Sequence, residues 1–270
     1  MDTRPLILIS NDDGIESPGI LAAAQALAPL ANLIIAAPQV QQSATGRSLR
    51  AHPDAVFQPH TLAVGQESIQ GWSLDATPAT TVRHALQCLC QERKPDLLVS
   101  GINFGENAGS NVTASGTVGA AIQGATWGIP SLAVSLEVPQ EFHYEHGEVD
   151  WSQAIKILHQ AAKKFLHTPW PEDVHIIKID IPDSVTSTTP WRACRLSRQP
   201  GWWGYVPNAN PQAKAGTTIG KRGPRPGEQW CEGDDLSVLL EKREITITPL
   251  SLDMSSRVDL GEFSALFTGN

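Results

Sequence analysis

The sequence lacks the patterns typical of an exported, disulfide-bonded or membrane-spanning protein. Its four cysteines form no CxxC pair and no zinc-like spacing, so we interpret them as reduced thiols. No signal-like apolar segment precedes the first strand-like run, and the most apolar stretch, residues 20–37, is interrupted by Gln25, Pro29 and Asn32. These interruptions argue against a membrane span. We therefore expect a cytoplasmic protein.

Positive charge is also scarce. The 270 residues carry 20 Lys and Arg against 28 Asp and Glu, which gives a formal net charge of −8. Binding to a nucleic-acid polymer or to an anionic membrane depends on clustered basic side chains, so we expect neither as a partner. With 41% hydrophobic and 18% charged residues, the chain has enough apolar side chains to form a core, which excludes the disordered and fibrous classes.

Several common catalytic motifs are missing. No GxSxG motif is present and no GxGxxG follows the first predicted strand, which argues against α/β-hydrolases and nucleotide-cofactor dehydrogenases. Residues 216–222 are one residue too short between glycine and lysine to form a P-loop. His143 and His146 do not have the spacing of the HExxH zinc motif, which favours a polar loop there.

What the sequence does contain is an alternation of apolar runs with segments of helical periodicity. Short apolar runs that end in turn residues are typical of buried parallel strands, and amphipathic segments are typical of the helices that cover them. The predicted strands are 6–9, 33–36, 96–100, 131–135 and 174–181, and the predicted helices begin near residues 17, 77, 115 and 151. We predict a doubly wound α/β fold, with a mostly parallel, Rossmann-like sheet between two helical layers. Shorter candidate strands at 55–57 and 68–74 predict an antiparallel insertion.

The residue composition and periodicity of the sequence change near Thr189. Tryptophans then lie among many Gly, Pro and Asn residues without sustained periodicity. We predict that residues 1–188 form the α/β core with the functional loops, and that residues 189–270 form an extended arm with a β-hairpin and a C-terminal helix. Exposure of Trp202, Trp203 and Tyr205 to water would be costly. We expect them to be buried against a partner subunit, with stacking on a substrate base as the alternative.

The loop after the first strand contains the strongest chemical signal. An open parallel sheet binds ligands beyond the carboxyl ends of its strands, and Asn11, Asp12, Asp13 and Gly14 follow the first strand directly. Adjacent carboxylates repel each other unless a cation lies between them, and oxygen ligands suit Mg²⁺ or Mn²⁺. A solvated turn is the alternative, because Asn, Asp and Gly are also good turn formers.

Two further loops are suited to an anion. Gly or Asn occupies every other position from 101 to 109, and such residues offer backbone N–H groups and side-chain amides. A flexible connector would have a similar composition. Ser115, Gly116 and Thr117 begin a predicted helix, whose free N–H groups and hydroxyls can bind phosphate. An ordinary serine cap on a closely packed helix is the alternative.

Taken together, these loops resemble those of the SurE family, the survival-protein nucleotidases, which are metal-dependent phosphatases. The matching segments are residues 9–14, 18–20, 37–38, 43, 100–107, 115–118 and 247–250. The resemblance is strong to about residue 140 and looser beyond it. The chain departs from the family pattern at Gln39, Thr80, Ala114 and Gln123, none of which is an implied metal ligand.

The resemblance implies a site, a substrate and an assembly. One divalent ion per subunit, Mg²⁺ or Mn²⁺, would be held by Asp12, Asp13, Ser43 and Asn103, of which the two aspartates would be catalytic. The residues implied at the substrate phosphate are Asn11, Asn107, Ser115, Gly116 and Thr117. Family members release phosphate from nucleoside 5′- and 3′-monophosphates, some trim short polyphosphate, and they form homodimers or homotetramers through the C-terminal arm.

For the mechanism we predict direct attack by a metal-oriented water. Haloacid-type phosphatases, which form a phospho-aspartate, have one residue between their two acids, whereas Asp12 and Asp13 are adjacent. The alternative from a different functional class is a nucleotide-binding regulatory protein without significant turnover.

Overall fold

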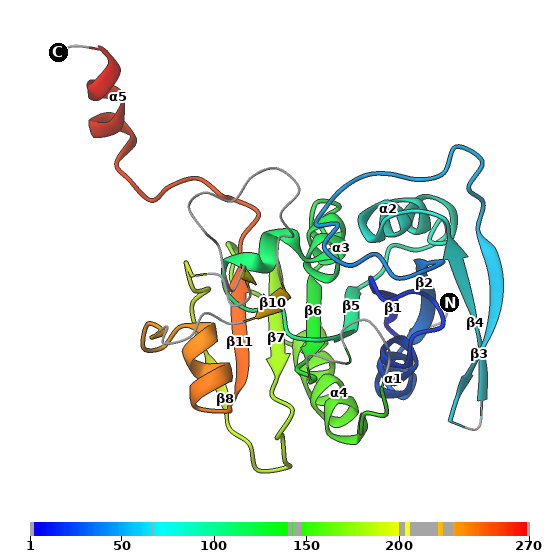
Figure 1. Ribbon diagram of the computed structural model, residues 1–270. Helices are drawn as coiled ribbons and strands as arrows, with labels where there is room; N and C mark the ends of the chain where they lie inside the picture. The colour runs from blue at the N-terminus through cyan, green and yellow to red at the C-terminus, as the bar shows by residue number, and fades with distance from the viewer. Residues whose placement is uncertain are drawn as a thin grey trace.

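A central sheet organises the chain (Figure 1). The computed structural model describes residues 3–65, 67–139, 142, 147–199, 203–205, 221–223 and 229–268. In these residues nine strands form one sheet in the order β3-β4-β2-β1-β5-β6-β7-β11-β8. The strands are β1 (Leu6–Ser10), β2 (Asn32–Pro38), β3 (Gln58–Val64), β4 (Glu67–Leu74), β5 (Leu97–Phe104), β6 (Ser131–Leu136), β7 (Ile176–Ile181), β8 (Trp191–Ala193) and β11 (Ile245–Leu250). A separate antiparallel pair consists of β9 (Trp203–Tyr205) and β10 (Lys221–Gly223).

The strand order confirms the predicted doubly wound topology. All neighbouring pairs from β4 through β2, β1, β5 and β6 to β7 are parallel, whereas β3 and β11 are antiparallel to their neighbours β4 and β7. From β1 the chain moves outward to β2 and β4, then returns to β5 on the other side of β1. The loops after β1 and β5 therefore diverge at a switch point, where folds of this type bind their ligands.

One local prediction was wrong. The first strand of the insertion is β3, at Gln58–Val64, and residues 55–57 form no strand. The burial of β3 alternates near its end, where Leu62 and Val64 are buried, as expected for an edge strand with one face against the core. The short apolar run at 55–57 is instead part of the connection that leads into the hairpin.

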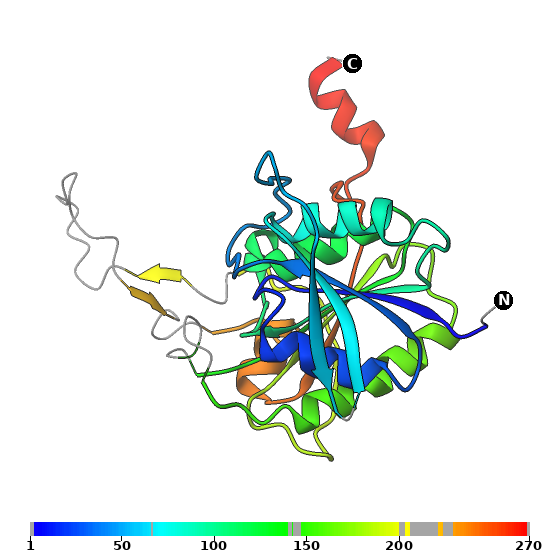
Figure 2. The same ribbon diagram turned by 90° about the vertical axis from the view of Figure 1, so that its right-hand side faces the viewer.

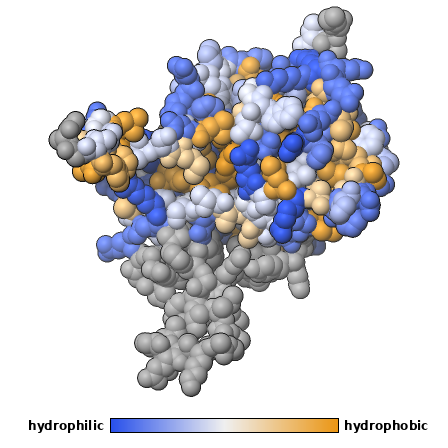
Figure 3. Space-filling view, turned by 90° about the horizontal axis from the view of Figure 1, so that it is seen from above, coloured by the Kyte–Doolittle hydropathy of each residue, from blue (hydrophilic) through white to orange (hydrophobic). Residues whose placement is uncertain are grey.

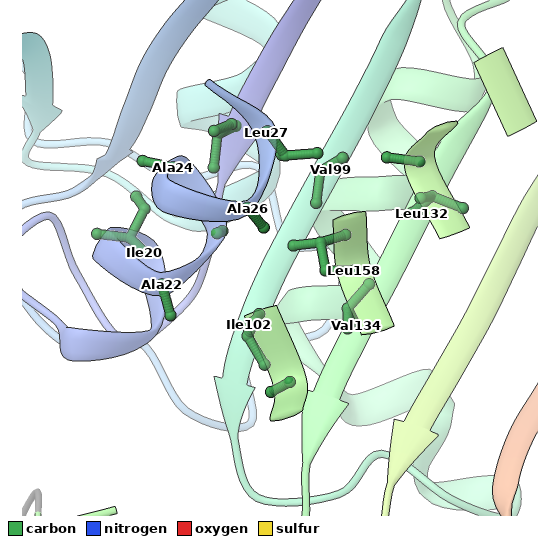
Figure 4. Packing of buried hydrophobic residues seen from close by; sticks show 14 of the residues in the cluster. Ile20, Ala22, Ala24, Ala26, Leu27, Val99, Ile102, Leu132, Val134 and Leu158 are labelled. Atoms are coloured by element: carbon green, nitrogen blue, oxygen red, sulfur yellow. The ribbon is translucent and has the colours of Figure 1, made fainter. Parts of the chain in front are cut away.

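Four helices cover the sheet in two layers (Figure 2). The helices are α1 (Pro18–Leu27), α2 (Pro78–Cys88), α3 (Gly116–Ala125) and α4 (Ser152–His167). Side chains of α1 and α4 belong to one apolar cluster and those of α2 and α3 to another. Figure 4 shows Ile20 and Leu27 of α1, together with Leu158 of α4, in one cluster with β5 and β6. Burial of these apolar side chains stabilises the fold by about 1.5–3 kcal/mol for each large residue.

The helix α1 packs very closely against the end of β5. Ser17 caps it by accepting a hydrogen bond from the Ile20 N–H at 3.3 Å, and Pro18 occupies its first turn. A Cβ atom on Gly19 would lie 1.9 Å from the carbonyl oxygen of Ile102, so only glycine allows this approach. The contact fixes the loop after β1 against the loop after β5, where the candidate site lies.

The C-terminal residues leave the body of the protein. The helix α5 (Leu260–Thr268) has no buried residue and projects away from the sheet in Figures 1 and 2. In Figure 3 this helix is the projection at the left, and its exposed apolar side chains appear in orange. Among the described residues, no helix is long and apolar enough to cross a membrane.

Before this projection, the chain after residue 189 returns to the sheet. Strands β8 and β11 add to the edge beside β7, and a short helical turn, η3 (Ser237–Glu241), precedes β11. The side chains of Trp202, Trp203 and Tyr205 lie outside the described residues, as do His143, His146 and most of residues 216–222. The predictions made for them stay predictions.

Candidate active site

Two adjacent carboxylates lie at the carboxyl end of β1. Asp12 and Asp13 are each only 6% exposed. Asn11 holds the turn that carries them, because its side-chain NH₂ donates to the Gly14 carbonyl at 3.0 Å and to the Ser17 hydroxyl at 2.6 Å, and its Oδ1 accepts the Gly14 N–H. Asn11 is fully buried. Its described contacts all lie within this turn, so it supports the carboxylates from behind.

Asp12 lies at the N-terminus of α3. The Thr117 hydroxyl donates to Asp12 Oδ1 at 2.5 Å, and the backbone N–H groups of Thr117 and Gly116 also favour the charged carboxylate. Ser115 caps the helix by accepting the Val118 N–H at 3.1 Å. The partial positive charge of a helix N-terminus stabilises an anion. Here that anion is Asp12. Ser115, Gly116 and Thr117, which the family resemblance implies at the substrate phosphate, therefore also hold a carboxylate in place.

Asp13 joins the loop after β1 to the end of β5. Its Oδ2 accepts the Phe104 N–H at 3.0 Å, and its Oδ1 lies 3.4 Å from the side-chain nitrogen of Gln41. Asn103 is therefore next to a residue that contacts Asp13. The NH₂ group of Asn103 donates to the Gly105 carbonyl at 2.6 Å. Within the described residues its Oδ1 accepts no hydrogen bond, which leaves an oxygen able to bind a cation.

The loop after β2 reaches the same place. The Gln42 N–H donates to the Asp12 backbone carbonyl at 2.7 Å, and Gln41 contacts Asp13. Ser43 follows directly and its side chain is exposed. Ser43 is thus adjacent in sequence to two residues that contact the aspartates, and it has no described hydrogen bond to either carboxylate.

The electrostatics of the pair fit a bound cation. Burial raises the pKa of Asp12, and burial followed by the charge of Asp12 raises the pKa of Asp13 to about 8. Among the described residues, no Lys, Arg or His forms an ion pair with either carboxylate. Two buried like charges without a counter-ion cost several kcal/mol each. A divalent ion with oxygen ligands would offset that cost.

The described part of the chain contains no group of three or more His, Cys, Asp or Glu side chains able to hold a metal. A cation here would therefore need neutral oxygen ligands beside Asp12 and Asp13. The Asn103 carbonyl oxygen and the Ser43 hydroxyl are such groups, and water or substrate oxygens would complete the set, as is usual for Mg²⁺.

Asn107 lies further along the loop after β5. Its NH₂ group donates to the Ser135 hydroxyl at 2.8 Å, and its backbone N–H donates to Asp180 Oδ1 at 2.7 Å. Asp180 and the neighbouring Lys178 were missed by the sequence analysis, which treated 174–181 only as a buried strand. The available signal was a Lys and an Asp two positions apart, on the same face of an otherwise apolar strand.

Glu106 provides a prediction on pH. It is buried, and its pKa is raised to about 8, first by burial and then by the charges of Glu137 and Asp180, while Arg243 acts in the opposite direction. In the unfolded chain the pKa is near its usual 4.5. Between these values the folded state keeps a proton that the unfolded chain has lost, so Glu106 makes the protein less stable as pH rises.

Glu106→Gln should therefore flatten the fall in the free energy of unfolding between about pH 5 and pH 8, by up to about 1.4 kcal/mol per pH unit. Urea denaturation at several pH values would measure this slope. The exposed Glu172→Gln is the matched control and should leave the slope unchanged. Equal slopes for Glu106→Gln and wild type would refute the prediction.

Comparison with known proteins gives one consistent result. The family model for survival protein SurE matches residues 7–201. The protein 5′-nucleotidase SurE of Methanocella arvoryzae is 34% identical over 276 residues, covering 98% of each chain. The protein of the same name from Methanothrix thermoacetophila is 33% identical, over 96% of this chain and 97% of its own. The crystal structure of the SurE protein from Aquifex aeolicus superimposes with a TM-score of 0.73 at 28% identity, covering 97% and 99% of the two chains.

Proposed function

The chain belongs to the SurE family, and from this premise we propose that it is a divalent-metal-dependent 5′-nucleotidase, a phosphoric monoester hydrolase acting on nucleoside 5′-monophosphates. Its relatives carry the name 5′-nucleotidase. The observation in the structure that best supports the proposal is the buried pair Asp12 and Asp13, held by α3 and β5 at the switch point with no described cationic partner. Nucleoside 3′-monophosphates and short polyphosphate are further candidate substrates.

We propose that Asp12, Asp13, Ser43 and Asn103 hold one Mg²⁺ or Mn²⁺ ion. When bound, the ion would polarise the phosphoryl oxygens and orient a water molecule. The protein's own contribution is to fix the two carboxylates, through Thr117 and Phe104, so that they need not reorganise during the reaction. We propose that the N-terminus of α3 and Asn107 border the phosphate and orient it for in-line attack.

The reaction we propose is a single displacement. The water oxygen forms a bond to phosphorus as the bond to the ester oxygen breaks, and the leaving alkoxide gains the proton that the water loses. A phospho-aspartate is disfavoured because Asp12 and Asp13 are adjacent, whereas the haloacid-type phosphatases that form one have a residue between their two acids. Trapping a phosphorylated Asp12 or Asp13, detected by mass spectrometry, would overturn this part of the proposal.

Phosphate release from the four nucleoside 5′-monophosphates and their 3′ isomers tests the function. Assays would contain EDTA, Mg²⁺ or Mn²⁺. We expect turnover with metal and none with EDTA. Tight nucleotide binding by calorimetry, without phosphate release under any condition, would instead support a nucleotide-binding regulatory protein.

We also propose that the chain forms a homodimer or homotetramer through residues 189–270, its C-terminal arm. Leu260, Leu266 and Phe267 on α5 are each 72–76% exposed, which is costly in water, and none of the described residues of this helix is buried. Removal of residues 256–270 should shift the sedimentation coefficient at micromolar concentration toward that of a monomer. A full-length chain that already sediments as a monomer would contradict the proposal.

A further inference from the structure

The most unusual side chain in the core is a lysine. Lys178 lies in β7 and is fully buried, as are Asp180 in the same strand and Asp235 just before η3. The Lys178 ammonium forms an ion pair with Asp180 and another with Asp235 Oδ2, the latter at 3.0 Å. Burial acts to lower the pKa of Lys178, but the two carboxylates outweigh it and raise the pKa overall. The lysine is therefore charged, and one ammonium is shared between two carboxylates.

The two carboxylates also bind the loop after β5. Asp180 Oδ1 accepts the Asn107 N–H at 2.7 Å, and Asp235 Oδ2 accepts the Gly109 N–H at 3.0 Å. Asp235 Oδ1 accepts the Ser197 N–H at 2.8 Å. Hydrogen bonds to charged acceptors are about twice as strong as those between neutral groups. One buried ion cluster thus fixes two alternate backbone N–H groups of a loop that is rich in glycine.

The position of that loop gives the cluster its significance. The loop begins beside Asn103 and Phe104, which border Asp13, and it continues through η1 (Ser110–Ala114) to the N-terminus of α3, which holds Asp12. Asn107 and Gly109 lie midway between these two contacts. A shift of the loop would therefore displace Asn107, whereas the separate hydrogen bonds at the two ends would still hold Asp13 and Asp12.

Stability alone does not require the cluster. Replacing a buried ion pair by apolar residues of similar volume is often neutral or stabilising. Apolar side chains could not accept the N–H groups of Asn107, Gly109 and Ser197, however, and buried N–H groups need acceptors. Only the carboxylates can accept these N–H groups and so fix the backbone segments that carry them.

We propose that Lys178, Asp180 and Asp235, here called the buried clamp, are positioning residues that hold the loop 105–109 in the geometry that binds the substrate phosphate. The inference rests on the proposed function, because it takes the role of Asn107 from there. It also assigns a part in the site to Asp235, which reaches the site from the segment after residue 229.

The test compares Asp235→Asn with Asp234→Asn. Asp234 is the adjacent buried acid, and its Oδ1 accepts the Ser237 N–H at 2.8 Å rather than an N–H of the loop. For both variants and wild type we would measure kcat and KM with a nucleoside 5′-monophosphate, inhibition by inorganic phosphate, and Mn²⁺ affinity by electron paramagnetic resonance. Thermal melting would establish that each variant is folded.

Asp235→Asn should lower kcat/KM by about 10–100-fold and weaken inhibition by inorganic phosphate at least fivefold. Its Mn²⁺ affinity should stay within twofold of wild type, because Asp12 and Asp13 are untouched. Asp234→Asn should resemble wild type in all three. A folded Asp235→Asn with wild-type kinetics and phosphate inhibition would overturn the inference. Absence of turnover in wild type would instead refute the proposed function.

Thr246→Val is the second variant, in case Asp235→Asn does not fold. The Thr246 hydroxyl accepts the Asp180 N–H at 3.0 Å and lies 3.3 Å from Asp180 Oδ2. Valine has a similar shape but cannot make these contacts. For Thr246→Val we expect weaker inhibition by inorganic phosphate, unchanged Mn²⁺ affinity and a smaller, roughly threefold loss in kcat/KM. An unchanged kcat/KM would overturn the inference.

Discussion

Asp13→Asn should abolish metal-dependent phosphate release, with kcat/KM at least about 10³-fold below wild type. The amide keeps the shape of the side chain and can still accept the Phe104 N–H, so the loop should stay in place. What is lost is a negative charge that would hold the cation. Transition-state stabilisation by a metal is worth several kcal/mol, and about 4 kcal/mol corresponds to this factor.

The matched control for this change is Glu92→Gln. Glu92 is exposed and follows the C-terminus of α2, at the opposite edge of the sheet from the aspartates. Like Asp13→Asn, the Glu92→Gln variant replaces one carboxylate by an amide, and it should keep wild-type activity. If Asp13→Asn retained more than about a tenth of wild-type kcat/KM in Mg²⁺, the assignment of the acidic pair would be wrong.

Gly116→Ala should impair the site without a change of charge. An added Cβ would lie 2.6 Å from Asp12 Oδ2 and 2.7 Å from Asp12 Cβ. Both are short, well-fixed groups, so either the carboxylate or the N-terminus of α3 must move. A misplacement of catalytic groups by about 1 Å lowers the reaction rate by about 10²-fold. We therefore expect kcat/KM to fall by about that factor. Overpacking should also lower the free energy of unfolding by about 1–3 kcal/mol.

Gly261→Ala is the corresponding control, because Gly261 lies in the first turn of the exposed helix α5. It should leave activity unchanged. Phosphate release by Gly116→Ala at the wild-type rate would mean that the close approach of α3 to Asp12 is not needed for turnover. Circular dichroism would verify that the variant keeps its helices.

The fold was largely predictable because its signals are local. The apolar runs at Leu6–Ser10 and Leu97–Phe104 are buried almost throughout, so composition alone indicates strands of a parallel sheet. Ser17 and Ser115 mark the starts of α1 and α3, where both act as caps. The edge strand β3 was placed wrongly because only part of one face is buried, which weakens its apolar pattern.

The site was only partly predictable, and the reason is sequence distance. The acidic pair and the glycine-rich loop could be recognised because each is continuous in the chain. The pairing of Asp12 with Thr117, 105 residues apart, follows from the topology once the strand order is known. The contact of Asp235 with Gly109, across 126 residues, follows from no local pattern, because η3 is placed by tertiary packing.

That long-range contact has a consequence for the order of events during synthesis. The ribosome makes the two aspartates of the loop after β1 more than 200 residues before Asp235, but their surroundings stay incomplete until residues beyond 235 have emerged. A nascent chain that ended before this point would have β7 without its neighbour β11 and a lysine without one of its two counter-ions. The newly made protein should therefore gain its catalytic competence abruptly, once Asp235 and β11 have emerged, rather than as each segment appears.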